Sequence, residues 1–140
     1  MEIRIGNSSD CIIIKDIVPE GQVLGHNAGG SEFLRGTIQL QIREISSNIG
    51  ASFMIGEFKQ FQTDLEKLYD TLKHSFHFQN LEDNIDLTFT PTPNGQIKIK
   101  GLLRNGDYTG SINFEIETDQ SYLPGTIDNL KEMFSEMKIG

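Results

Sequence analysis

The chain has 140 residues, and its 20 acidic against 12 basic residues give a net charge of -8. Single domains most often have about 100–150 residues, so we expect one domain over residues 1–140. A negative field repels nucleic-acid phosphates and anionic lipid and attracts basic proteins. Direct nucleic-acid binding is therefore disfavoured and a basic protein partner is allowed, although acidity can also serve solubility alone.

The sequence carries no targeting or membrane signal. No stretch approaches the roughly 18 consecutive apolar residues that span a bilayer. The apolar run at residues 11–14 is too short for the core of a signal peptide, so we expect a cytoplasmic protein. Cys11 is the only cysteine and cannot form an internal disulfide. We expect it to be a small buried hydrophobe rather than a nucleophile.

The N-terminal third predicts strands interrupted by a loop. Residues 2–6 and 10–18 read as a hairpin, and the four glycines between Glu20 and Glu32 predict a loop. Alternating apolar residues then predict strands over 37–43 and 49–55. The turn between these two strands is expected at Ser46-Ser47-Asn48.

A change of period at Gly56 predicts a helix over about residues 57–75, because the apolar residues now fall on one stripe. Glu57 near its start would complement the helix dipole. The same holds for Lys73, His74 and His77 near its expected end.

Three further strands are predicted over 85–90, 97–100 and 112–117. They are separated by Pro93-Asn94-Gly95 and Asn105-Gly106-Asp107, and the Asn-Gly pair is a strong hairpin signal. A three-stranded meander is therefore expected.

A second helix is predicted over 124–138, with Pro124 in its first turn. The order of elements predicts an α+β fold, in which an antiparallel sheet of about six strands carries two amphipathic helices on one face. Similar apolar positions in 64–73 and 129–138 are consistent with an internal duplication, although any two amphipathic helices look alike.

No motif predicts a catalytic residue, a metal site or a cofactor. His74-x-x-His77 lacks a supporting third ligand. Glu115 and Glu117 share a strand face, to which Asp86 can be added, and this pattern allows acid–base chemistry or a divalent cation. Alternating carboxylates on a wet strand face are more often simply solvated.

The chain resembles the WapI-type immunity proteins of bacterial contact-dependent and wall-associated toxin systems. The resemblance covers most of the chain and rests on five blocks, of which the last is the most specific: Ile-Arg-Ile-Gly at 3–6, Glu-Phe-Lys-Gln-Phe at 57–61 leading into Leu-Glu-Lys-Leu-Tyr at 65–69, Ile-Asp-Leu at 85–87, Gly-Gln-Ile at 95–97, and Phe-Glu-Ile-Glu-Thr-Asp-Gln-Ser-Tyr-Leu-Pro at 114–124. The family often has an acidic, tryptophan-containing stretch before its third strand, whereas residues 27–34 contain no Trp.

The resemblance implies a non-enzymatic protein that binds a cognate toxin domain, typically a nuclease, and blocks it. It offers no catalytic residues, and the missing tryptophan leaves the identity of the toxin open. Because nuclease domains need positive charge to hold phosphate, an acidic surface suits such a partner. We expect the contact on exposed carboxylates of the wet sheet face and adjoining loops, namely Glu82, Asp83, Asp86, Glu115 and Glu117.

Two alternatives belong to other functional classes. A small-ligand or lipid carrier would need a cavity between sheet and helices, and a hydrolase would need converging carboxylates around Glu115 and Glu117. The sequence leaves the oligomeric state open.

Overall fold

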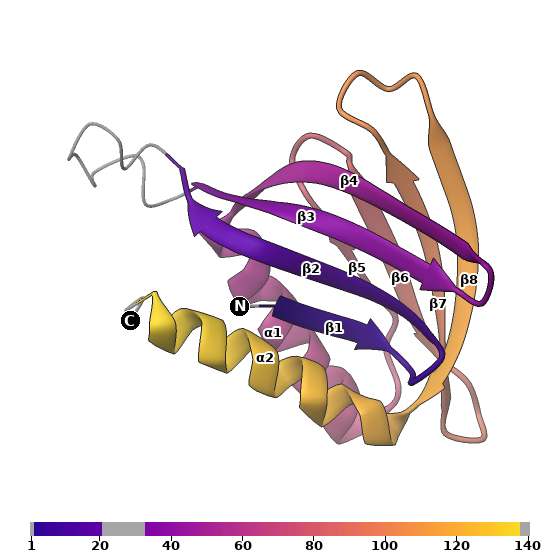
Figure 1. Ribbon diagram of the computed structural model, residues 1–140. Helices are drawn as coiled ribbons and strands as arrows, with labels where there is room; N and C mark the ends of the chain where they lie inside the picture. The colour runs from indigo at the N-terminus through magenta and orange to yellow at the C-terminus, as the bar shows by residue number, and fades with distance from the viewer. Residues whose placement is uncertain (1, 21–32, 138–140) are drawn as a thin grey trace.

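The computed structural model describes residues 2–20 and 33–137, which form eight strands and two long helices (Figure 1). The first half contains β1 (Glu2–Gly6), β2 (Asp10–Pro19), β3 (Phe33–Ile42), β4 (Ile45–Met54) and α1 (Ile55–Thr71). The second half contains β5 (Phe76–Gln79), β6 (Ile85–Pro91), β7 (Gln96–Arg104), β8 (Ser111–Asp119), a 3-10 turn (Gln120–Tyr122) and α2 (Leu123–Glu136). Of the loop expected between Glu20 and Glu32, residues 21–32 lie outside the described residues.

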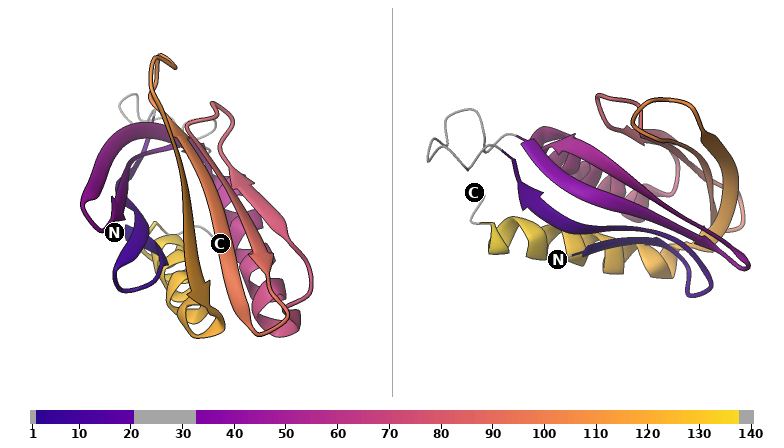
Figure 2. Two further views of the ribbon diagram at one scale, coloured as in Figure 1. Left: turned by 90° about the vertical axis from the view of Figure 1, so that its right-hand side faces the viewer. Right: turned by 45° about the horizontal axis from the view of Figure 1, so that its top comes forward.

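The strands form two sheets rather than one. Both are antiparallel with four strands each, in the orders β1-β2-β3-β4 and β5-β6-β7-β8. The expected α+β class is confirmed, whereas the single sheet of about six strands is wrong. Each sheet is followed by one helix, so the order of elements repeats along the chain, and the two helices lie side by side (Figures 1 and 2).

The two helices have the expected apolar stripes but slightly different ends. In α1 the buried side chains are Phe58, Phe61, Leu65 and Leu68, which lie three or four positions apart. The helix ends at Thr71, because Leu72 adopts a left-handed backbone with φ of 51°. Lys73 and His74 follow the end of the helix directly, whereas His77 lies in β5, so the expected dipole role of His77 is wrong.

Aromatic rings fill the space where α1 meets the two sheets. The ring centroids of Phe61 and Phe78 are 4.2 Å apart, and those of Phe53 and Phe58 are 4.8 Å apart. Phe89 stacks on Phe76 at 4.6 Å and continues the cluster into the second sheet. Side chains from both sheets and both helices thus belong to one hydrophobic core.

The turns show where local sequence signals were sufficient. Gly95 has a φ of 82° in the β6–β7 hairpin, as its Asn-Gly signal predicts. The β3–β4 turn lies at residues 43–44 rather than at 46–48, with Arg43 at a φ of 50°. In the β7–β8 turn the positive φ belongs to Tyr108, at 61°, and not to Gly106.

Gly101 lies in β7 opposite Phe114 of β8. A Cβ at Gly101 would come within 2.1 Å of Phe114 Cζ, so the phenyl ring occupies the space that a side chain would need. This packing explains why a glycine stands in the middle of a strand. Phe114 itself is partly buried against the core.

Cys11 is buried, as expected, and burial raises the pKa of its thiol. No helix in the described part of the chain is both long and apolar enough to cross a membrane.

Candidate functional site

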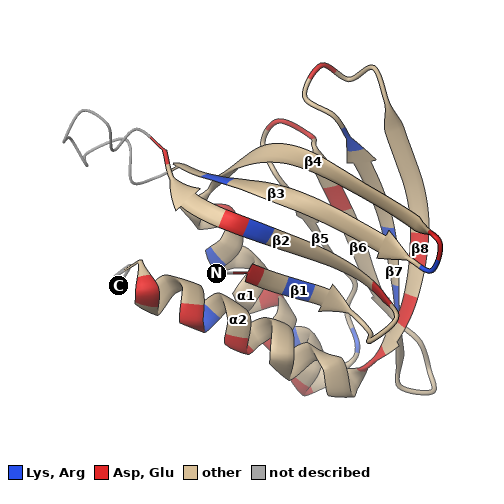
Figure 3. Ribbon diagram, viewed as in Figure 1, with Lys and Arg blue, Asp and Glu red and all other residues tan. Residues whose placement is uncertain are grey.

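The five carboxylates expected to bind a partner fall into two places on the second sheet. Asp86 lies on β6, and Glu115 and Glu117 lie on β8, all on the face that points away from the core. Glu82 and Asp83 lie in the turn between β5 and β6, where both are exposed. The two places differ in their charge balance (Figure 3).

Basic side chains offset most of the carboxylates on the sheet face. Strand register places Lys100 opposite Glu115 and Lys98 opposite Glu117. Lys98 Nζ lies 3.9 Å from Glu115 Oε2 in an exposed ion pair. Arg104 lies on the same face of β7, and Asp119 at the end of β8 shares the face of Glu115 and Glu117, so three basic side chains stand beside four carboxylates. Cross-strand pairs of opposite charge stabilise a sheet, and they leave this face with only a small excess of negative charge.

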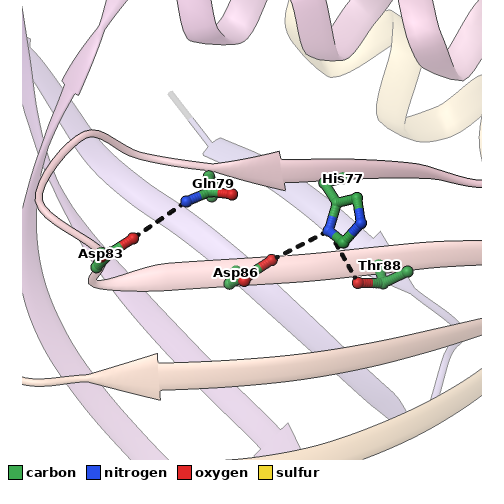
Figure 4. Close-up of polar contacts among 5 residues, drawn as sticks. All are labelled: His77, Gln79, Asp83, Asp86 and Thr88. Carbon is green, nitrogen blue, oxygen red and sulfur yellow. Dashed lines mark hydrogen bonds and ion pairs between the residues drawn. The ribbon is translucent and has the colours of Figure 1, made fainter.

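Asp86 approaches a histidine on the edge strand (Figure 4). His77 Nδ1 lies 3.5 Å from Asp86 Oδ1, and the same nitrogen lies 3.1 Å from Thr88 Oγ1. Asp86 Oδ1 is shielded from water and has no hydrogen-bond partner. His77, which the sequence placed at the end of a helix, is therefore part of this polar sheet face.

A buried asparagine builds the β5–β6 turn. Asn80 is only 1% exposed, and its Oδ1 accepts hydrogen bonds from the backbone N–H groups of Asn84 at 2.8 Å and Ile85 at 3.1 Å. Its Nδ2 donates to the backbone carbonyl of Ser52 in β4 at 3.0 Å. Gln79 Nε2 donates to Asp83 Oδ1 at 3.1 Å (Figure 4). The turn is thus fixed to both sheets.

Glu57 supports the same turn from the first turn of α1. Its carboxylate accepts hydrogen bonds from the backbone N–H groups of Met54, at 2.7 Å, and Leu81. Burial raises the pKa of Glu57, and the two backbone hydrogen bonds oppose that rise. Leu81 is consequently held at its backbone while its side chain is 73% exposed.

The β7–β8 turn has its own asparagine and lies at the same end of the second sheet (Figure 1). Asn105 Oδ1 accepts from Gly110 N at 3.0 Å, and Tyr108 N donates to the carbonyl of Asn105 at 3.0 Å. Asp107 Oδ1 accepts from Thr109 Oγ1 at 2.7 Å and from Thr109 N at 3.2 Å. These two hydrogen bonds lower the pKa of Asp107 below its ordinary value of 3.8.

Hydrogen bonds join the two turns to each other. The hydroxyl of Tyr108 donates to the backbone carbonyl of Glu82. Arg104 N donates to the carbonyl of Asn84 at 2.9 Å, and Asn84 Nδ2 donates to the carbonyl of Arg104 at 3.2 Å. We call the two joined turns, residues 80–84 and 105–110, the acidic tip, because they contain Glu82, Asp83 and Asp107 and no lysine or arginine.

The pKa of Asp107 provides a direct check of the geometry at the tip. We expect NMR titration of the Asp107 carboxyl to give a pKa below 3.8, and Thr109→Val to raise it toward 3.8 by removing the hydroxyl donor. Because the folded-state pKa is lowered, the stabilisation is present at neutral pH and is lost as the pH falls below 3.8. An unchanged pKa in Thr109→Val would contradict the Asp107–Thr109 hydrogen bond.

The described residues contain no group of three or more His, Cys, Asp or Glu side chains that could hold a metal ion.

Comparison with models of known protein families identifies a match: the model of the WapI-like immunity protein family matches residues 21–138. The chain belongs to the WapI-like immunity protein family. None of the curated proteins matches this sequence. The family model covers both the sheet face and the acidic tip.

Solved structures show where else this fold occurs. The chain of this WapI-like immunity protein is similar to the plant transcriptional regulator PBF-2, with 11% identity, a TM-score of 0.52 and coverage of 94% of this chain and 86% of that one. For WHY3 from Arabidopsis thaliana the identity is 13% and the TM-score 0.51, with coverage of 94% of this chain and 85% of that one. For MRP1/MRP2 from Trypanosoma brucei the identity is 10% and the TM-score 0.50, with coverage of 98% of this chain and 84% of that one. At these identities the likeness concerns the fold alone.

The structure adds residues that sequence reasoning missed. The Asn105-Gly106-Asp107 turn was recognised, but Asp107 was not connected with Glu82 and Asp83, which precede it by more than 20 positions. Leu81 and Tyr108 are exposed apolar side chains beside these carboxylates. No local pattern predicts that two turns of different hairpins meet, because the register of β6 with β7 sets their distance.

Proposed function

We propose that this protein neutralises a cognate bacterial toxin domain by binding it, without catalysis, in the cytoplasm of the cell that produces both. The observation that carries the proposal is the match of the WapI-like immunity protein family over residues 21–138. The net charge of -8 supports a basic partner, and a nuclease domain fits because it needs positive charge to hold phosphate.

The binding surface that we propose is the second sheet with its turns. It includes Glu82, Asp83, Asp86, Glu115 and Glu117 as candidate contacts, and four of these five are exposed. Carboxylates at the rim of an interface act mainly on the rate of association and on specificity. Raising the salt concentration should therefore slow binding, since exposed charges are screened over about 8–10 Å at physiological ionic strength.

Neither alternative class gains support from the described residues. A carrier requires a deep hollow between sheet and helix, whereas the rings of Phe53, Phe58 and Phe61 fill the interior around α1 and are at most 1% exposed. The hollows between β1 and α2, of about 390 Å³, and between α1 and β5, of about 380 Å³, are open to solvent rather than enclosed. A hydrolase requires converging carboxylates, whereas Glu115 and Glu117 each face a lysine across the strand pair.

Co-expression with the toxin domain encoded beside this protein tests the proposal. We expect the toxin domain alone to stop growth, and co-expression of the wild-type chain to restore survival and to give a complex that co-purifies. A core variant that does not fold, such as Phe61→Asp, serves as the control for expression load. If the folded wild-type chain neither restores growth nor co-purifies with the toxin domain, the proposed function is wrong.

A further inference from the structure

Two of the most exposed apolar side chains of the described chain lie within the acidic tip. Leu81 is 73% exposed and Tyr108 is 56% exposed. The two turns that carry them are joined by the hydrogen bond from Tyr108 to the carbonyl of Glu82. Exposed apolar side chains that are surrounded by polar residues are typical of protein–protein contact sites. Tyrosine in particular is enriched among residues that dominate binding energy.

The backbone at both residues is held in place before any partner binds. Leu81 follows the buried Asn80, and its backbone N–H is held by Glu57. Tyr108 has a left-handed backbone with φ of 61°, which is uncommon for a bulky residue and is held by its N–H bond to Asn105. A loop whose backbone is already ordered loses less conformational entropy on binding.

The charge around the two side chains selects the class of partner. The tip holds three carboxylates and no basic residue, whereas three basic side chains offset most of the carboxylates of the neighbouring sheet face. The hydrogen bonds from Thr109 lower the pKa of Asp107, so its carboxyl is ionised at neutral pH. A second copy of this chain would bring three more carboxylates to the same place, and nucleic acid would bring phosphates, so both are repelled. A basic protein surface is attracted.

We propose that the acidic tip is the primary contact for the toxin domain, with Tyr108 and Leu81 entering apolar depressions within a basic surface while Glu82, Asp83 and Asp107 face the surrounding lysines and arginines. This inference rests on the proposed function and assigns its interface. The sheet face with Asp86, Glu115 and Glu117 lies beside the tip and forms a secondary contact with the toxin domain.

The test measures the binding of the purified toxin domain to full-length variants by calorimetry and stopped flow. Tyr108→Asn suits the left-handed backbone, and Leu81→Ser removes a side chain that lies in solvent. We expect each to raise Kd by about 30-fold or more, which corresponds to a central interface residue. Tyr108→Phe keeps the ring and should stay within about 5-fold of wild type.

Matched controls separate the tip from general effects of exposure and charge. Ile45→Ser changes an apolar side chain that is 58% exposed at the start of β4 and should leave Kd unchanged. Glu82→Lys with Asp107→Asn should slow association by about 10-fold and weaken its salt dependence. Glu132→Lys with Glu136→Gln changes the net charge equally on α2 and should have a much smaller effect.

Failure of the inference and failure of the proposed function give different results. If wild type binds the toxin domain and both Tyr108→Asn and Leu81→Ser bind as tightly as Ile45→Ser, the tip is not the contact and the inference is overturned. If wild type itself does not bind, the proposed function fails first. Thermal unfolding of every variant confirms that a loss of affinity does not come from loss of the fold.

Discussion

Replacing Asn80 with alanine is expected to lower the free energy of unfolding by about 3–5 kcal/mol, although the residue lies in a turn. Its side chain is 1% exposed and satisfies the N–H groups of Asn84 and Ile85 together with the carbonyl of Ser52. A buried polar group left without its partner costs about 1–3 kcal/mol, and three such groups lose theirs here. The midpoint of urea denaturation measures the effect.

Asn94→Ala is the matched control for this change. Asn94 lies in the β6–β7 turn, where it is exposed and accepts a hydrogen bond only from Thr92 Oγ1, at 2.8 Å. We expect Asn94→Ala to change the free energy of unfolding by no more than about 0.5 kcal/mol, as for most surface substitutions. Equal costs for Asn80→Ala and Asn94→Ala would show that the buried hydrogen bonds do not hold the tip. Faster hydrogen exchange at residues 81–85 in Asn80→Ala would show that its anchoring role is local.

The second large effect is expected for Phe61→Ala, which should lower the free energy of unfolding by about 3–5 kcal/mol. Phe61 is 1% exposed, and its ring centroid lies 4.2 Å from that of Phe78, 5.7 Å from Phe89 and 6.2 Å from Phe76. Its removal takes apolar surface out of the core and leaves a cavity that β5 and β6 cannot close without moving. It also separates α1 from the second sheet.

Tyr69→Ala on the same helix is the control, because Tyr69 is 38% exposed and lies outside the aromatic cluster. Phe61→Leu keeps most of the volume and should cost less than Phe61→Ala, by analogy with other swaps that preserve volume. Calorimetric unfolding of the three variants should rank them as Phe61→Ala, Phe61→Leu and Tyr69→Ala in order of decreasing loss. A cost below that of Tyr69→Ala would contradict the central position of Phe61.

Much of the secondary structure follows from local sequence. The apolar stripe of α1, the first-turn position of Pro124 and the positive φ of Gly95 all depend on residues within a few positions of each other. The outward direction of Glu115 and Glu117 follows in the same way from alternation along β8. The family resemblance likewise came from short blocks of sequence, and the family match confirms it.

The sequence by itself therefore determined the class of fold, both helices, most strands and the family. Only the tertiary structure decided that the strands form two sheets, because pairing between distant strands has no local signal. Register placed Lys98 and Lys100 opposite Glu117 and Glu115 of β8, which offsets most of the negative charge expected on this face. The same long-range pairing brought the turns of Leu81 and Tyr108 together, because their distance depends on the alignment of β6 with β7 and not on residues near either turn.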